Sequence, residues 1–239
     1  MIDVHTHILP AIDDGATNVA VSVNMLKMLD RQGVTDVVAT PHFKPSFISS
    51  VDRFLLERDK SHKLLLNDIS GMSNLPRVRL GAEVTLCVDM ARLENLERLC
   101  IEGTPYLLVE FDISSFDNWV YNTLFEIRVR RSVIPIIAHI DRYFGVLRHE
   151  TIKKIMDLGC PTQFNASSLI KLATRAKTVN LIREYPEQIC LVGSDCHDVI
   201  WRKPEMDKFA AKADKIVGEG FLDYLQNRSQ AMLDGKIIY

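Results

Sequence analysis

The chain has 239 residues, of which 47% are hydrophobic and 25% charged, as in an ordinary globular enzyme of one or two domains. Lysine and arginine number 29 against 31 aspartate and glutamate, so the formal net charge of -2 gives no reason to expect a nucleic-acid partner. No run of about 18 apolar residues occurs, and Asp3 and His5 interrupt the apolar core that a signal peptide would need. We therefore expect a cytoplasmic protein that does not insert directly into a membrane.

The cysteines give a second indication of the compartment. They are odd in number and form no C-x-x-C pair: Cys87, Cys100, Cys160, Cys190 and Cys196. This pattern argues against a disulfide framework and against a structural zinc ribbon, and it favours a reducing compartment.

The first forty residues predict a β-α-β unit. Apolar and polar residues alternate over residues 2–7 as in a short strand, so His5 and His7 should project to the same side. A helix is expected over residues 17–32, and a buried strand over residues 34–40 ends at Pro41-His42. Such units build parallel sheets.

The rest of the chain continues this alternation. Further strands are predicted at residues 78–84, 106–111, 133–138, 161–165 and 189–193. Helices are predicted at residues 51–68, 118–131, 149–158 and 174–185 and over most of the chain after residue 204, and residues 89–102 should be a short helical or irregular connection. Seven strands alternating with helices predict an α/β fold with one closed or nearly closed barrel, and a single domain over residues 1–239.

Possible metal ligands gather at the carboxyl ends of the predicted strands, which open on one face of a parallel barrel. Five of the seven histidines lie within a residue or two of these ends, whereas His62 and His149 lie on helices. The candidate ligands, counting one aspartate from the first loop, are His5, His7, Asp14, His42, Glu83, Glu110, His139, Asp195 and His197. Each of them alone would more often be a structural residue. Together they favour a metal site, because burying so many ionisable groups without a cation is costly.

These residues stand in motifs that resemble a known superfamily. The motifs, in order, are residues 5–15 (HTHILPAIDDG), Thr40-Pro41-His42, Gly81-Ala82-Glu83, Leu108-Val109-Glu110, residues 137–143 (IAHIDRY) and Ser194-Asp195-Cys196-His197. They are similar to the PHP (polymerase and histidinol phosphatase) superfamily and, more narrowly, to the manganese-dependent protein tyrosine phosphatases encoded with bacterial capsule and exopolysaccharide genes. Carboxylates at Asp14 and Glu110, where other members often have histidine, favour the narrower group.

The resemblance implies a distorted seven-stranded (β/α)7 TIM-like barrel of the PHP type with three divalent metal ions. The three ligand sets would be His5, His7, Glu83 and Asp195; then Glu83, Glu110 and His139; and finally Asp14, His42 and His197. Manganese is expected, with iron or zinc as alternatives, because mixed imidazole and carboxylate ligands suit these ions. A metal-bridging hydroxide would be the catalytic nucleophile.

Two arginines match positions that the resemblance assigns to substrate phosphate. Arg142 lies three residues after His139, and Arg202 lies five residues after His197. A planar guanidinium suits a phosphate group well. The alternative is that each forms a surface ion pair, with Asp141 or Glu205.

Other residues near these positions have two interpretations. Tyr143, Phe43 and Trp201 are candidates for stacking on a phenyl ester and equally for packing. Cys196 and Arg202 have the C-x5-R spacing of cysteine-dependent tyrosine phosphatases. The residues between them include no glycine and several bulky side chains, which a phosphate-binding loop does not tolerate, so we expect no catalytic thiolate.

The expected function is hydrolysis of phosphotyrosine on a protein partner. The resemblance implies that this partner is the tail of a tyrosine kinase that regulates capsular or exopolysaccharide synthesis. One alternative is a PHP-type phosphatase of histidinol phosphate or another small molecule, and another is a non-catalytic, metal-stabilised binding protein. The sequence leaves the oligomeric state open. Ile140-Asp141, Cys196 and the glycine-free stretch 167–171 depart from the family pattern without removing a ligand.

Overall fold

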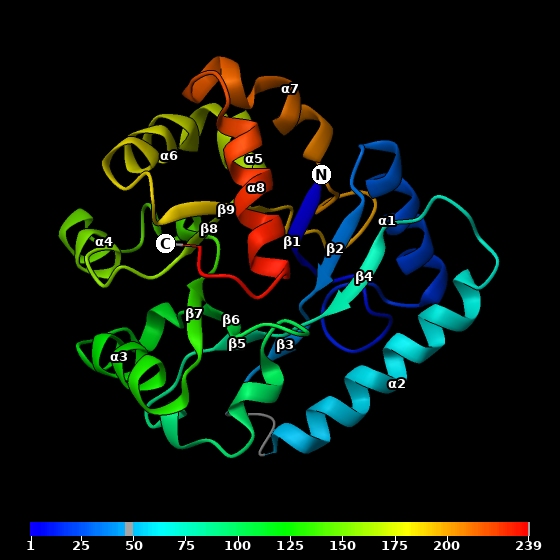
Figure 1. Ribbon diagram of the computed structural model, residues 1–239, viewed down its shortest axis with the longest axis horizontal. Helices are drawn as coiled ribbons and strands as arrows, with labels where there is room; N and C mark the ends of the chain where they lie inside the picture. Colours follow the sequence, from blue (N-terminus) through cyan, green and yellow to red (C-terminus); the bar gives the residue numbers. More distant parts are fainter. Residues whose placement is uncertain (46–49, 239) are drawn as a thin grey trace.

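The computed structural model describes residues 1–45 and 50–238, in which parallel strands are surrounded by helices (Figure 1). Within these residues the α-helices are α1 (Val19–Arg31), α2 (Val51–Ile69), α3 (Trp119–Arg131), α4 (His149–Met156), α5 (Ala166–Ile170), α6 (Leu172–Glu184), α7 (Met206–Val217) and α8 (Phe221–Leu233). Short 3-10 helices occupy Met90–Arg92, Leu96–Leu99, Ile113–Ser115 and Ile140–Tyr143. The expected domain over residues 1–239 includes residues 46–49 and 239, which lie outside the described residues.

The strands form two parallel sheets. They are β1 (Ile2–Thr6), β2 (Asp36–Ala39), β3 (His42–Phe43), β4 (Arg77–Leu80), β5 (Glu83–Thr85), β6 (Tyr106–Glu110), β7 (Ile134–Ile137), β8 (Thr162–Asn165) and β9 (Ile189–Gly193). One sheet has the order β1-β2-β4, and the other has the order β3-β5-β6-β7-β8-β9. The expected parallel α/β fold is therefore present. The expected single seven-stranded barrel is not found as one closed sheet among the described residues.

Two strands were not predicted as they occur. The second predicted strand ends at Pro41, as expected, but a short strand β3 that was not predicted follows it, and the third predicted strand is interrupted between β4 and β5 at Gly81-Ala82. Pro41 has no N–H to donate, which explains a break in the ladder at this point. Backbone hydrogen bonds still cross the break, from Gly81 N to Ala39 O at 2.9 Å and from Glu83 N to Pro41 O at 3.1 Å. The break falls immediately before two candidate ligands, His42 and Glu83.

The first and last strands meet at their carboxyl ends. Thr6 and Cys196 form an isolated parallel bridge beyond the end of β9. Asp195 N donates to His5 O and His7 N donates to Cys196 O, each at 2.9 Å. This contact places candidate ligands from residues 5–7 and 195–197 side by side.

Apolar strands and helix faces form the core. In β6, Leu107, Leu108 and Val109 are buried, as expected for strands with helices on their outer side. Helix α1 begins after Asn18, whose side chain accepts a hydrogen bond from Val21 N, one residue later than the expected cap at Thr17. Helix α5 was not predicted, because five residues are too few to show a helical period. No helix in the described parts of the chain is long and apolar enough to cross a membrane.

Candidate metal centre

His5 and His7 project from β1 and its end into the interior, on the same side as predicted. Both are buried, and their Nε2 atoms lie 3.1 Å apart. A glycine in each neighbouring segment permits this placement: a Cβ at Gly193 would lie only 2.6 Å from His5 Cβ, and one at Gly15 would collide with the backbone of His7. The two imidazoles therefore occupy a tightly enclosed position.

Glu83 is the carboxylate at the middle of the centre, with an exposed fraction of 0%. Its Oε2 lies 3.2 Å from Nε2 of both His5 and His7 and 3.1 Å from His42 Nδ1. Its Oε1 lies 2.6 Å from His139 Nε2. Burial alone would raise the pKa of Glu83, but His5 and His139 hold that pKa well below its usual value. One carboxylate thus faces four imidazoles.

Asp195 lies beside the same pair of histidines. Its Oδ1 is 3.7 Å from His5 Nε2 and 3.6 Å from His7 Nε2. Burial opposes ionisation of Asp195, but His5 and His7 lower its pKa to about 2. Its backbone has φ +53°, a left-handed conformation that aspartate tolerates better than most residues.

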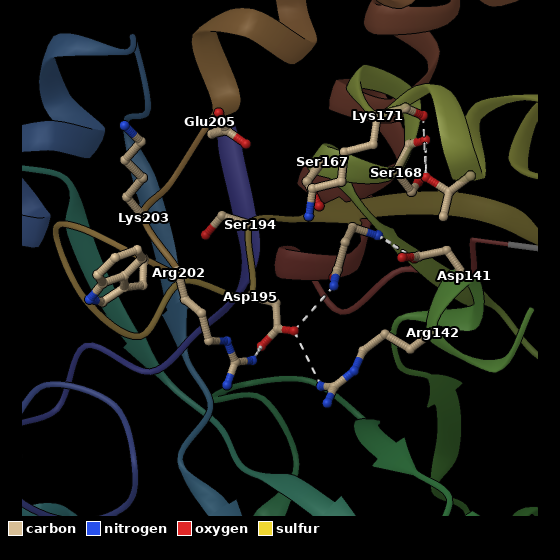
Figure 2. Close-up of a pocket in the computed structure, with 13 residues that line it drawn as sticks. Asp141, Arg142, Ser167, Ser168, Lys171, Ser194, Asp195, Arg202, Lys203 and Glu205 are labelled. Carbon is tan, nitrogen blue, oxygen red and sulfur yellow. Dashed lines mark hydrogen bonds and ion pairs between the residues drawn. The ribbon is translucent and has the colours of Figure 1, made fainter. Parts of the chain in front are cut away.

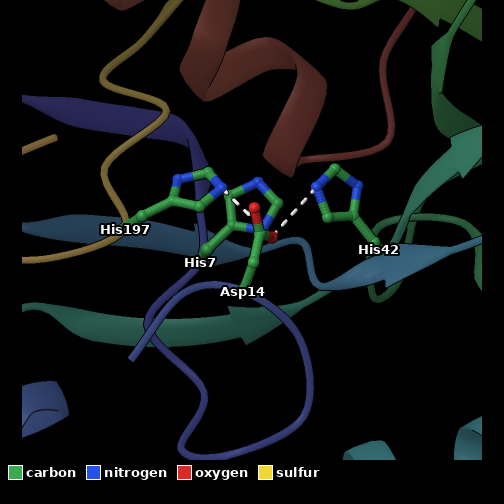
Figure 3. Close-up of side chains that lie close together, drawn as sticks. All are labelled: His7, Asp14, His42 and His197. Carbon is green, nitrogen blue, oxygen red and sulfur yellow. Dashed lines mark ion pairs between the residues drawn. The ribbon is translucent and has the colours of Figure 1, made fainter. Parts of the chain in front are cut away.

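A second group surrounds Asp14, as Figure 3 shows. Asp14 Oδ1 lies 3.3 Å from His42 Nε2 and 3.5 Å from His197 Nε2. Ligand atoms of these three residues and of His7 all lie within 4.8 Å of one another. Burial and the neighbouring His7 lower the pKa of His197 to about 4, which favours the neutral imidazole that binds metals. Asp14 itself is 63% exposed, so this group faces the outside.

Glu110, at the end of β6, completes the third group. Its Oε1 lies 3.5 Å from His42 Nδ1, and its Oε2 lies 3.9 Å from His139 Nε2. His42, Glu83 and Glu110 have atoms that could hold one ion, whereas the resemblance placed His139 in that set. The structure therefore brings all nine predicted side chains together, with His42 and His7 each close to two groups. Two of these groups overlap the implied sets, one through His5, His7 and Glu83 and the other through Asp14, His42 and His197, and the assignment of residues to individual ions stays a prediction.

Buried atoms without partners show that these residues fit metal ions. Glu83 Oε2, His42 Nδ1, His139 Nδ1 and His197 Nε2 are buried and form no hydrogen bond in the described structure. Glu83 Oε2 and His42 Nδ1 lie 3.1 Å apart, but without the geometry of a hydrogen bond. Such atoms are costly to bury, and a cation bound to them would offset that cost. Imidazole and carboxylate donors without thiolate suit manganese, iron or zinc.

Asp13 was not predicted as a functional residue, but it holds His7 and His42 in place. Its Oδ2 lies 2.7 Å from His7 Nδ1 and accepts the backbone N–H of His42 at 3.1 Å, while its Oδ1 accepts the N–H of Gly15. Burial would lower the pKa of His7, but the hydrogen bond that His7 donates to Asp13, together with the nearby Glu83, raises that pKa to about 10. Asp13 stands next to Asp14 in the sequence, and nothing local distinguishes a ligand from its support.

Gln163 and Asn165, on β8, were also missed. Gln163 Oε1 lies 3.3 Å from His5 Nδ1 and accepts the N–H of His139 at 2.7 Å. Asn165 Nδ2 donates to Asp195 Oδ2 at 3.1 Å. The signal was two polar residues at alternate positions in a buried strand, which place both side chains on one face.

Arg142 and Arg202 both contact Asp195. Arg202 Nη2 donates to Asp195 Oδ1 at 2.9 Å, and Arg142 Nη1 donates to Oδ2 at 3.4 Å. Among the described residues, neither arginine forms the alternative ion pair with Asp141 or Glu205; Glu205 pairs instead with Lys208. Both guanidinium groups are partly exposed at the edge of the centre, as Figure 2 shows.

The three aromatic candidates and Cys196 differ in how far they are buried. Tyr143 and Phe43 are buried packing residues, and the Tyr143 hydroxyl accepts the N–H of Phe111 at 2.9 Å. Trp201 is 89% exposed. Cys196 is fully buried, and burial raises the pKa of its thiol well above the usual value, which opposes formation of a thiolate.

Comparisons with known proteins find relatives over nearly the whole chain. The model of the family described as "Capsular polysaccharide synthesis, CpsB/CapC" matches residues 1–233. The tyrosine-protein phosphatase YwqE of Bacillus subtilis is 26% identical over 243 residues, which cover 100% of this chain and 94% of that protein. The tyrosine-protein phosphatase CpsB of Streptococcus pneumoniae is 26% identical over 216 residues, with 87% of each chain covered.

Two solved structures show the fold. One, described as YwqE from Bacillus subtilis and CpsB from Streptococcus pneumoniae, unique metal-dependent tyrosine phosphatases, has a TM-score of 0.82 at 24% identity and covers 100% of this chain and 96% of that chain. The histidinol phosphate phosphatase of Lactococcus lactis, complexed with zinc, L-histidinol and phosphate, has a TM-score of 0.57 at 10% identity and covers 90% of this chain and 92% of that chain.

Proposed function

The chain belongs to the CpsB/CapC family of capsular polysaccharide synthesis, and from this premise we propose that it is a metal-dependent protein tyrosine phosphatase. The observation that carries the proposal is the buried group of histidines and carboxylates around Glu83, which has unpartnered atoms and two arginines at its edge. Curated relatives over nearly the whole chain are named tyrosine-protein phosphatases. The chemistry of the centre and the names of these relatives point to the same reaction.

The proposed ligands are the nine side chains of the centre, and the proposed cofactor is three divalent ions, manganese before iron or zinc. When bound, these ions would activate a water molecule for attack on phosphorus and neutralise charge on the phosphoryl oxygens. Glu83 would contribute to more than one ion, because its two oxygens face different histidines. Asp13 and Gln163 would fix the orientation of His7 and His5.

The proposed role of Arg142 and Arg202 is to bind the substrate phosphate. Their guanidinium groups approach the two oxygens of Asp195 from the partly exposed edge of the centre. Asp195 therefore holds both arginines beside the ions' position, where planar N–H donors match phosphate oxygens. The buried Cys196 has no part in this mechanism.

The proposed substrate is a phosphotyrosine-bearing protein. We propose that it is a tyrosine kinase that regulates capsule assembly, and the description of the family by capsular polysaccharide synthesis supports the capsule context. We also propose a cytoplasmic location and a single domain over residues 1–239. The five cysteines are all free in the structure, as a reducing compartment would require.

The test combines metal analysis with activity. Purified protein is analysed for metal content and assayed on a phosphotyrosine peptide and on histidinol phosphate, before chelation, after chelation and after addition of Mn²⁺. We expect activity on the peptide that chelation abolishes and Mn²⁺ restores. His5→Ala should lose metal and activity while remaining folded, whereas Cys196→Ser should keep activity within about threefold.

Each competing interpretation has its own outcome. Turnover of histidinol phosphate with no activity on phosphotyrosine peptides would establish a small-molecule phosphatase. Metal-loaded protein without activity on any aryl phosphate would establish a binding protein. Loss of activity in Cys196→Ser with the metals still bound would replace the metal mechanism by a thiolate mechanism.

A further inference from the structure

A cavity of about 500 Å³ opens beside Asp195 and extends away from the metal centre (Figure 2). Arg142, Asp195 and Arg202 line it where it meets the centre. Its other walls come from α5 and the start of α6 on one side, and from residues 201–205 on the other. Pockets of this size hold whole small molecules, so a single phosphate bound by the two arginines would leave most of this cavity for other parts of the substrate.

The carboxylates that line the cavity already have partners. Asp195 is paired with both arginines. Asp141 is largely buried, and its Oδ1 accepts the N–H of Asn165 at 2.7 Å. Glu205 pairs with Lys208 at 2.6 Å. These carboxylates therefore all have contacts within the protein.

Two lysines that line the cavity have no such partner. Within residues 1–45 and 50–238, neither Lys171 nor Lys203 forms a side-chain hydrogen bond or an ion pair. They lie on opposite walls, and Figure 2 shows the amino group of Lys171 directed toward the middle of the cavity and that of Lys203 directed away from it. The cavity therefore has the positive charge of Lys171 available for a ligand.

We propose that this cavity is a second binding site for the substrate chain, and that it takes an anionic group near the phosphotyrosine. Lys171 is its principal binding residue. The anionic group is a carboxylate side chain or a second phosphate, since an ammonium binds both. The inference rests on the proposed phosphotyrosine activity and adds to it a preference among phosphotyrosine sequences.

The test compares three phosphotyrosine peptides on the metal-loaded enzyme. One has neutral residues around the phosphotyrosine, one has aspartates at the three positions on either side, and one has a second phosphotyrosine in place of these aspartates. We expect kcat/KM for the anionic peptides to exceed that for the neutral peptide by about threefold to fivefold, a typical upper range for partly exposed charge pairs. The preference should shrink as salt is added. A preference for the second phosphate alone would identify phosphate rather than carboxylate as the ligand.

Lys171→Met keeps the aliphatic part of the side chain and removes its charge, so the ratio of kcat/KM values between anionic and neutral peptides should fall to about one. Lys177→Met, a change of the same kind on α6 and outside this cavity, should keep the wild-type ratio. If Lys171→Met kept the wild-type ratio, as Lys177→Met should, the proposed subsite would be wrong and the proposed phosphatase activity would be unaffected. Absence of turnover for all three peptides would overturn the proposed function itself, and the subsite with it.

Discussion

A surface cavity and the metal centre differ in how their charged groups are paired. In the surface cavity lined by Arg58, Asp59, Glu97 and Arg98, positive groups have negative partners: Arg58 pairs with Asp59, Arg98 with Asp52, and Glu97 with Arg131. The acidic partners are exposed, so water solvates them as well. Around Glu83 in the metal centre, His5, His7 and His139 are buried, and the single carboxylate of Glu83 is shared among four imidazoles.

The difference shows which feature identifies a site. Exposed ion pairs contribute only about 0–1 kcal/mol each and form wherever opposite charges meet on a surface. Buried groups without complete partners cost several kcal/mol, and such costs persist mainly where a bound ion or a function offsets them. Two features distinguish the metal centre from the surface cavity: several histidines share the carboxylate of Glu83, and buried atoms around it form no hydrogen bond. The number of charges does not distinguish the two regions.

The largest expected effect is that of Glu83→Gln, which changes the metal centre and not the surface cavity. Glu83→Gln keeps the size of the side chain but removes the charge that faces four histidines. We expect kcat/KM on a phosphotyrosine peptide to fall by more than about a hundredfold, beyond the range for residues that only support a ligand. Bound metal, measured by elemental analysis, should fall with it.

Glu97→Gln, at the surface cavity, is the matched control. Its kcat/KM should stay within about twofold of wild type, because surface changes rarely exceed about 0.5 kcal/mol. A Glu83→Gln protein with full metal content and full activity would remove the distinction between the two regions.

The sequence was sufficient to locate the centre because of one topological rule. Parallel strands open their carboxyl ends on the same side, so a histidine or carboxylate at each end could be assigned to one place without knowledge of distances. His139 after β7 and Glu110 at the end of β6 are examples that lie far apart in the chain and 3.9 Å apart in space. Which ligand serves which ion depends on rotamers and on loop geometry, and local sequence does not encode these.

The supporting residues and the sheet breaks were harder to predict for physical reasons. Asp13 and Asp14 have the same side chain, and only the turn that follows decides that Asp13 faces His7. Gln163 does not ionise, so a search for charged ligands passes over it. The break at Gly81-Ala82 falls inside residues 78–84, whose pattern also fits one continuous strand.

An intermediate effect is expected at Asp13. Asp13→Asn can still accept a backbone N–H, but its neutral amide no longer supplies the charge that orients and stabilises His7. We expect metal affinity, measured by titration of chelated protein with Mn²⁺, to weaken by about 10–100-fold. Asp59→Asn at the surface cavity should leave the titration unchanged. Equal affinities for Asp13→Asn and wild type would show that the first loop holds His7 without this hydrogen bond.

The smallest effect concerns His62 on α2, a histidine that belongs to neither region. Burial lowers its pKa, and its Nε2 is buried without a hydrogen-bond partner. Asp13 raises the pKa of His7 by a direct hydrogen bond, whereas Asp59 and Glu102 act on His62 only at a distance and do not offset burial. The folded state therefore favours neutral His62, while the unfolded chain takes up a proton near pH 6.5.

The consequence is a loss of stability on the acid side. The contribution of neutral His62 is fully present above pH 6.5 and is lost as the pH falls through 6.5 toward the lowered folded-state pKa. His62→Gln should therefore unfold in urea with a weaker dependence on pH between 7.5 and 5 than wild type, with no change in metal content or phosphatase activity. Parallel stability curves for the two proteins would show that the ring of His62 is as well solvated in the folded protein as in the unfolded chain.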